Sequence, residues 1–226
     1  MIEDKFANGW PPLERLGVQF VPDVTPYETM KLRLLNAGHS VLGFPGAIHG
    51  HPTIDACMRD PVFATFLRRF LDMEVTPTLG TIEGIDIEAY KDSLAVRFAN
   101  PNIKDGVSRI CSESAAKLPK FLMPTLRDNL ANDGPIQHAT FILAAWCYYS
   151  DRQTNERDEA LNIMDAQSAA LHEAAKGTTK DWTAFLRQPE LFGDLVEHPR
   201  FVEAYTELVQ RVYAAGDVRG VMSGLE

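Results

Sequence analysis

The helical part of this chain begins with the stretch Thr25-Pro-Tyr-Glu-Thr-Met-Lys-Leu-Arg-Leu-Leu-Asn-Ala-Gly-His39. Thr25 can accept a hydrogen bond from the backbone N–H of Glu28 while the Glu28 side chain reaches back to Thr25, which makes a capping box. Pro26 suits the first helical position, where no N–H is needed. The sequence therefore predicts a helix that begins at Pro26.

Three polar side chains are predicted to share one side of this helix. Because each residue of an α-helix advances by about 100°, Asn36 lies about 140° and His39 about 80° from Lys31. Leu35 and Leu42 project close to Lys31, so the amine is expected to emerge among apolar neighbours. Burial lowers the pKa of a lysine and would make Lys31 a general base, with amide and imidazole donors beside it for an alkoxide oxygen. The same spacing also fits a lysine that extends its charge to water beside hydrogen-bonded core residues.

Further helices are predicted along the rest of the chain. Asp60-Pro61 and Asp86 are typical helix starts, and Gly134-Pro135 precedes an apolar helix that runs to Tyr149. Breaks are expected at Gly43–Gly46, Gly50–Pro52, Pro119 and Pro124. The remaining predicted helices cover residues 155–176, 181–187 and 199–215, with Gly177 and Gly216 as C-terminal signals. Residues 25–226 are thus predicted to form an all-α domain of irregular helices, which would be the catalytic and substrate-binding domain.

Residues 1–24 have a different character. They contain two strand-like runs, at residues 2–6 and 17–21. Two isolated strands have only marginal stability in water, so we expect that the sheet to which they belong lies elsewhere. The chain has no Gly-x-Gly-x-x-Gly that follows a strand and opens a helix, so no cofactor-binding residues are predicted in it.

The composition excludes several kinds of partner. The 226 residues are 45% hydrophobic with a net charge of -9 and no dense run of Lys or Arg, which argues against nucleic acid. The most apolar stretch, residues 141–149, is far shorter than the roughly 20 residues that cross a bilayer. Three cysteines without a paired Cys-x-x-Cys predict reduced thiols and a cytoplasmic location.

A series of short motifs occurs in a fixed order: Lys31-x4-Asn36-x2-His39, Asp72-Met-Glu-Val-Thr-Pro-Thr-Leu79, Ala89-Tyr-Lys, Arg97-Phe-Ala-Asn-Pro101, Arg109-Ile-Cys111 and Lys117-Leu-Pro-Lys-Phe121. Together they resemble the C-terminal domain of the polyol-specific long-chain dehydrogenases, especially the mannitol 2-dehydrogenases. The resemblance covers essentially the whole chain.

The resemblance implies a metal-independent, NAD-dependent enzyme that interconverts a polyol and its 2-keto sugar, such as mannitol and fructose. It implies Lys31 as the general base, Asn36 as the residue that stabilises the oxyanion, and His39 as a residue that orients the substrate. It also implies an N-terminal Rossmann domain that binds NAD, with residues 1–24 as the segment between the domains. The isolated chain is therefore expected to be nearly inactive.

Arg109 and Lys117 are predicted to bind the substrate. Eight residues apart on one predicted helix, they would lie about 80° apart and point at one ligand. A solvated basic face is the alternative from spacing alone; the resemblance implies substrate binding. Lys120, just beyond Pro119, is also compatible with a purely structural role.

Two other patterns in the sequence allow different interpretations. Tyr27 lies four residues before Lys31, as in the Tyr-x-x-x-Lys of short-chain dehydrogenases, but the glycine-rich turn and upstream serine of that family are absent. His49, His51 and Asp55 offer nitrogen and oxygen ligands for a metal. Histidines in a Gly/Pro loop are commonly surface residues and the resembling family needs no metal, so no metal site is predicted.

Two alternative functions remain open at this stage. One is a hexuronate reductase of the same superfamily, which acts on fructuronate or tagaturonate. The other is a non-catalytic helical domain that binds a protein partner through an exposed apolar patch.

Overall fold

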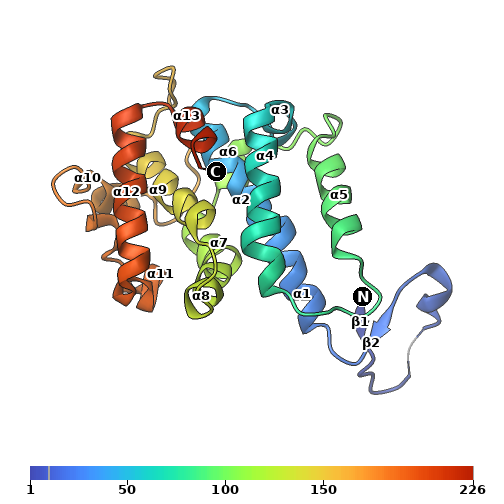
Figure 1. Ribbon diagram of the computed structural model, residues 1–226. Coiled ribbons are helices and arrows are strands. Elements are labelled where there is room, and N and C mark those ends of the chain that lie inside the picture. The colour runs from blue at the N-terminus through green and yellow to red at the C-terminus, as the bar shows by residue number, and fades with distance from the viewer. Residues whose placement is uncertain (10, 226) are drawn as a thin grey trace.

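The computed structural model describes residues 1–9 and 11–225 (Figure 1). Helices dominate this part of the chain, and its one sheet has two strands, which confirms the predicted all-α class. The α-helices are α1 (Thr25–Lys31), α2 (Ala37–His49), α3 (Ile54–Arg59), α4 (Pro61–Arg69), α5 (Ile87–Phe98), α6 (Val107–Cys111), α7 (Ser114–Phe121), α8 (Met123–Ala131), α9 (Gln137–Arg152), α10 (Ser168–Lys176), α11 (Pro189–Phe192), α12 (Pro199–Ala215) and α13 (Val218–Ser223). Short 3-10 helices cover Leu13–Leu16, Thr76–Thr78, Ala184–Leu186 and Gly193–Glu197, and π turns cover Leu32–Asn36 and Phe70–Val75.

The N-terminal strands pair with each other. Strand β1 (Ile2–Glu3) lies parallel to β2 (Phe20–Val21), with Ile2 opposite Phe20. The residues between them provide the long connection that a parallel pair needs. The two strands therefore pair within the chain itself, and the pair projects at one end of the molecule (Figure 1). A larger sheet to which this pair belongs stays a prediction.

The first helix starts one residue earlier than predicted and without a capping box. Helix α1 begins at Thr25, after Val24, and no side chain caps it. Instead, Oδ1 of Asp23 accepts a hydrogen bond from the backbone N–H of Thr25 at 2.9 Å. The helix then continues through the π turn and α2 to His49.

The predicted break at Gly43–Gly46 is wrong, because these glycines serve close packing instead of a turn. A Cβ on Gly43 would lie 2.8 Å from Cγ2 of Ile110, and one on Gly46 would lie 2.5 Å from Sγ of Cys57. Pro45 lies inside α2 and Pro119 inside α7. The helices continue through both prolines, and Gly43, Pro45 and Gly46 are buried in α2.

Helix starts with an aspartate are confirmed. The Asp60 carboxylate accepts the N–H of Val62 at 2.9 Å at the start of α4, and that of Asp86 accepts the N–H of Ala89 at 3.0 Å at the start of α5. Gly216 ends α12 in the left-handed conformation, as predicted.

Two predicted helices are wrong. Of residues 155–176 only Ser168–Lys176 is helical; the first part is a loop in which Thr154 and Ala160 form an antiparallel bridge. The predicted helix at 181–187 shrinks to the 3-10 turn Ala184–Leu186. Both segments are anchored by side-chain hydrogen bonds, such as that of Arg157 to the carbonyl of Gly50, in place of an apolar helical face.

Helix α9 forms the centre of the core. It packs between α12 and α2 (Figure 1), and its side chains from Ala139 to Cys147 are completely buried. Its N-terminus is capped from a distance by the buried Glu74, which lies in the second π turn. The Glu74 carboxylate accepts the N–H groups of His138 and Ala139 at 2.6 and 2.9 Å. Three buried, unpaired thiols, Cys57, Cys111 and Cys147, also lie in this core.

Candidate functional site

The helix that carries Lys31, Asn36 and His39 is interrupted by the π turn Leu32–Asn36. The N–H of Ala37 donates to the carbonyl of Leu32, five residues earlier. A π turn holds roughly one more residue than an α turn, so residues five apart lie approximately above one another. The α-helical projection therefore overestimates the angle between Lys31 and Asn36.

Lys31 is exposed in this chain, contrary to the expectation that apolar neighbours bury it. Its neighbours Met30 and Leu34 occupy the core side of the helix, while the amine points outwards and has no hydrogen bond or ion pair within residues 1–9 and 11–225. The expectation was wrong because the helix packs on the core through Met30 and Leu34, which turns Lys31 away from the core.

Four of the five predicted site residues line one cavity. Asn36 and His39 from the first long helix, Arg109 from α6 and Lys117 from α7 surround a space of about 290 Å³, with Leu35, Ser40, Ile110 and Phe121 as the other lining residues. The Asn36 amide makes no hydrogen bond within the described ranges, so both its donors are available. Lys31 does not line this cavity, and neither does Lys120, which is exposed.

Arg109 and Lys117 reach the cavity from two helices instead of the predicted single one. The chain turns between α6 and α7 at Glu113, whose φ is 50°. The Lys117 ammonium donates to Oγ of Ser112 at 3.2 Å and to the carbonyl of Ile110 at 3.3 Å, at the C-terminal end of α6. Burial, and secondarily the nearby Arg109 charge, lowers the pKa of Lys117. The ammonium is thus fixed at the cavity wall.

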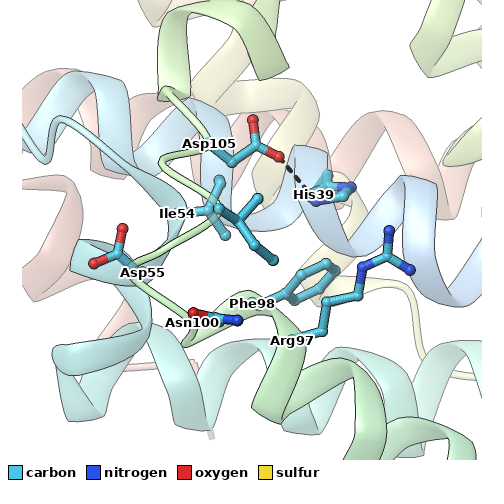
Figure 2. A pocket seen from close by; sticks show the side chains of 8 residues that line it. His39, Ile54, Asp55, Arg97, Phe98, Asn100 and Asp105 are labelled. Atoms are coloured by element: carbon cyan, nitrogen blue, oxygen red, sulfur yellow. Dashed lines mark ion pairs between the residues drawn. The ribbon is translucent and has the colours of Figure 1, made fainter.

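His39 also faces a second, smaller cavity (Figure 2). This space of about 50 Å³ lies between α2 and the end of α5 and has room for only a few waters. His39 packs against the Phe98 ring at a centroid distance of 4.4 Å, and its Nε2 lies 3.6 Å from Oδ2 of Asp105. Burial lowers the pKa of His39 to about 4, although Asp105 opposes the shift. The imidazole is therefore neutral at pH 7.

Asp105 is the residue of this site that sequence reasoning missed. It contacts His39, and its carboxylate also accepts a hydrogen bond from Nε of Arg109 at 3.0 Å. One aspartate therefore positions two of the predicted substrate-binding residues. The only signal in the sequence is the four-residue spacing of Asp105 and Arg109, which is common on helices.

Because His39 is neutral in the folded chain, we expect the folded chain to lose stability at acidic pH. The pKa of a histidine is near 6.5 in the unfolded chain and about 4 for His39 in the folded chain. Between these two values the unfolded chain binds more protons than the folded chain. The free energy of unfolding therefore falls as the pH drops through this window. We expect His39→Gln to reduce the loss of unfolding free energy between pH 7 and pH 5 by about 2 kcal/mol. Urea unfolding of both proteins at the two pH values measures this, and an equal loss in both would contradict it.

Two other sequence patterns acquire structural explanations. The Tyr27 hydroxyl donates to the carbonyl of Glu83 at 3.0 Å, which ties α1 to the loop before α5. His49 and His51 do come together, but with Asp60 in place of Asp55, and Asp55 pairs with Arg59. None of the helices built from the described residues combines the length and the apolar character needed to cross a membrane.

Comparison with known proteins places this geometry in context. A family model described as the mannitol dehydrogenase C-terminal domain matches residues 23–213. Mannitol 2-dehydrogenase of Aspergillus fumigatus is 36% identical over 220 residues, which cover 96% of this chain and 44% of that protein. The enzyme of the same name from Phaeosphaeria nodorum is 39% identical over 206 residues, which cover 89% of this chain and 36% of that protein. The chain thus spans less than half the length of these relatives.

Solved structures show the same similarity. Mannitol 2-dehydrogenase of Pseudomonas fluorescens, in a ternary complex with NAD and D-mannitol, matches 99% of this chain and 45% of that chain with a TM-score of 0.92 and 34% identity. A D-sorbitol dehydrogenase in substrate-free form matches 97% of this chain and 45% of that chain, with a TM-score of 0.87 and 30% identity.

Proposed function

Because this chain belongs to the family of the mannitol dehydrogenase C-terminal domain, we propose that it is the substrate-binding and catalytic part of an NAD-dependent polyol dehydrogenase. The reaction would interconvert a polyol such as mannitol and its 2-keto sugar. The observation that carries this proposal is the cavity of about 290 Å³ in which Asn36, His39, Arg109 and Lys117 meet. It combines polar donors with a volume suited to a small sugar alcohol.

Lys31 and Asn36 would perform the proton and charge steps of the reaction. Oxidation removes a proton from the hydroxyl oxygen and a hydride from the carbon that bears it, and the oxygen gains negative charge as the O–H bond breaks. The Lys31 amine would accept the proton, and the Asn36 amide would donate a hydrogen bond to the oxygen. NAD, when bound beside the substrate, supplies the acceptor for the hydride.

An exposed lysine is a poor base at neutral pH, so Lys31 requires a change of environment. We propose that a dinucleotide-binding domain covers Lys31, excludes water and lowers the pKa of the amine. The absence of a partner for the amine within the described part of the chain supports this proposal, because no ion pair has to be broken. The residues of the described ranges form no multi-stranded parallel sheet for a nucleotide, so NAD would be held by that second domain.

The remaining cavity residues would hold the chain of hydroxyl groups. A neutral His39 can donate through one ring nitrogen and accept through the other, which suits a hydroxyl. Arg109 is already paired with Asp105, so its charge is partly neutralised before a ligand arrives. This pairing favours an uncharged polyol over the carboxylate of a hexuronate, which was the alternative substrate.

Mixing experiments test this proposal. The chain alone is expected to show almost no oxidation of mannitol. A mixture with the separately expressed dinucleotide-binding domain of the Pseudomonas fluorescens enzyme should regain NAD-dependent activity. This mixture should also reduce fructose faster than fructuronate. NADH absorbance follows both reactions, and each domain alone is the control. A complex that forms in gel filtration but oxidises no polyol would refute the enzymatic proposal, while faster reduction of fructuronate would favour the hexuronate reductase.

A further inference from the structure

A cluster of metal-ligating side chains lies at the far end of α2 from the cavity. His49 is the last residue of α2, His51 follows in the loop, and Asp60 starts α4. One possible ligand atom of each lies within 4.8 Å of those of the other two. At 1.5 Å per residue, the ten residues from His39 place His49 about 15 Å away along the helix, so this cluster is separate from the proposed substrate site.

The nitrogen of His51 is the feature that protein contacts leave unexplained. Its Nε2 is buried and has no hydrogen-bond partner within the described ranges. It lies 3.7 Å from Oδ2 of Asp60, which is too long for a hydrogen bond. Two ligand atoms that each lie about 2.0–2.2 Å from a tetrahedral zinc ion are roughly 3.4 Å apart, so this gap is close to that of two ligands of one cation.

His49 is held in the orientation that metal ligands adopt. Its Nδ1 lies 2.7 Å from Oε2 of Glu156, whose other oxygen accepts the N–H of Val218 at 2.6 Å. A neutral histidine that donates from Nδ1 to a carboxylate keeps an unprotonated Nε2, and metal-ligating histidines commonly have such a carboxylate partner.

The surroundings allow a cation to reach the cluster and limit how tightly it is held. A cavity of about 310 Å³, which His51 and Gly50 line, lies beside it. The side chains of His49, His51 and Asp60 are only 29%, 22% and 12% exposed. Asp60 is at present paired with Arg219, whose Nε donates to Oδ2 at 2.7 Å, so Arg219 competes with any cation for this carboxylate.

We propose that His49, His51 and Asp60 form a binding site for a divalent transition-metal ion of the zinc type, with Glu156 as the carboxylate that orients His49. Two imidazoles and a carboxylate are a ligand set that zinc accepts, with water in the remaining position. The ion would join the end of α2 to the start of α4, and through Glu156 to the start of α13. This site has no part in the proposed proton transfer at Lys31.

Zinc titration of the chelator-treated chain by calorimetry tests this site. One zinc ion per chain is expected. Glu156→Gln should weaken its binding by about 10- to 100-fold, and His49→Gln or His51→Gln by at least as much. His198→Gln removes an exposed histidine outside the cluster and should leave the affinity unchanged.

A gain-of-affinity variant separates ligand loss from misfolding. Arg219→Gln removes the competitor for Asp60 and is expected to tighten zinc binding, which an unfolded variant cannot imitate. Circular dichroism without zinc verifies the helical content of each variant. The proposal is overturned if the wild-type chain binds no zinc, if the double variant of His49 and His51 binds it with wild-type affinity, or if Arg219→Gln fails to bind more tightly.

Discussion

Replacing Lys31 by alanine, in the chain combined with a dinucleotide-binding domain, is expected to lower kcat for polyol oxidation by about 10²- to 10⁴-fold. The physical reason is the loss of the group that accepts the hydroxyl proton. The wild-type rate should rise with pH as the amine loses its proton, and the variant should lack this rise. Steady-state oxidation of mannitol between pH 6 and pH 10 measures both effects.

Two further substitutions make this experiment specific. Asn36→Ala should also lower kcat, by about 10²- to 10³-fold, but should keep the rise with pH because the base is still present. Lys120→Ala removes an exposed lysine that does not line the cavity, and its activity should equal that of the wild type. If Lys31→Ala retains most of its activity with an unaltered pH profile, Lys31 is not the base.

Replacing Glu74 by alanine is expected to lower the free energy of unfolding by about 3–5 kcal/mol. Glu74 is completely buried, and its carboxylate accepts two backbone N–H groups at the start of α9 and lies 3.0 Å from Nδ1 of His138. Alanine would leave these donors without partners inside the core and remove a negative charge from the positive end of the central helix. Urea unfolding followed by circular dichroism gives the difference.

Glu74→Gln is the matched control for this prediction. It keeps one acceptor oxygen and the volume of the side chain but turns an amide donor towards the remaining N–H groups. We expect a loss smaller than that of alanine. A Glu74→Ala protein that is destabilised by less than about 1 kcal/mol would mean that this carboxylate does not hold α9 in place.

The part of the fold that could be predicted from sequence depends on local interactions. Asp60 and Asp86 start helices because a carboxylate next to the first turn satisfies free N–H groups whatever surrounds it. At Gly43–Gly46 the predicted break was wrong, because a glycine required for close helix packing looks the same in sequence as one required for a turn. The loop at residues 153–162 depends on contacts of Glu156 and Arg157 with the distant end of α2, which no local pattern indicates.

The sequence predicted which residues lie together better than it predicted their geometry, and the roles of these residues stay predictions. The spacing of Asn36 and His39 predicted a shared face, and both residues line one cavity with Arg109 and Lys117. The projection overestimated the angle between Lys31 and Asn36 because it assumed an unbroken α-helix, whereas Leu32–Asn36 is a π turn. In the proposed enzyme a dinucleotide-binding domain covers Lys31, so the buried environment of this amine stays a prediction.

The widened turn at Leu32–Asn36 can absorb a change in the length of this segment. Removing a single amino acid between Lys31 and Asn36 would restore regular α-helical winding and leave these two residues about 40° apart, so their side chains would still share one side. Removing Ala37 or Gly38, which lie beyond the widened turn, would instead rotate His39 by about 100° relative to Asn36. Gene libraries of this protein are thus expected to tolerate a one-codon deletion within Leu32–Leu35 and to lose the variants with the same deletion at Ala37 or Gly38.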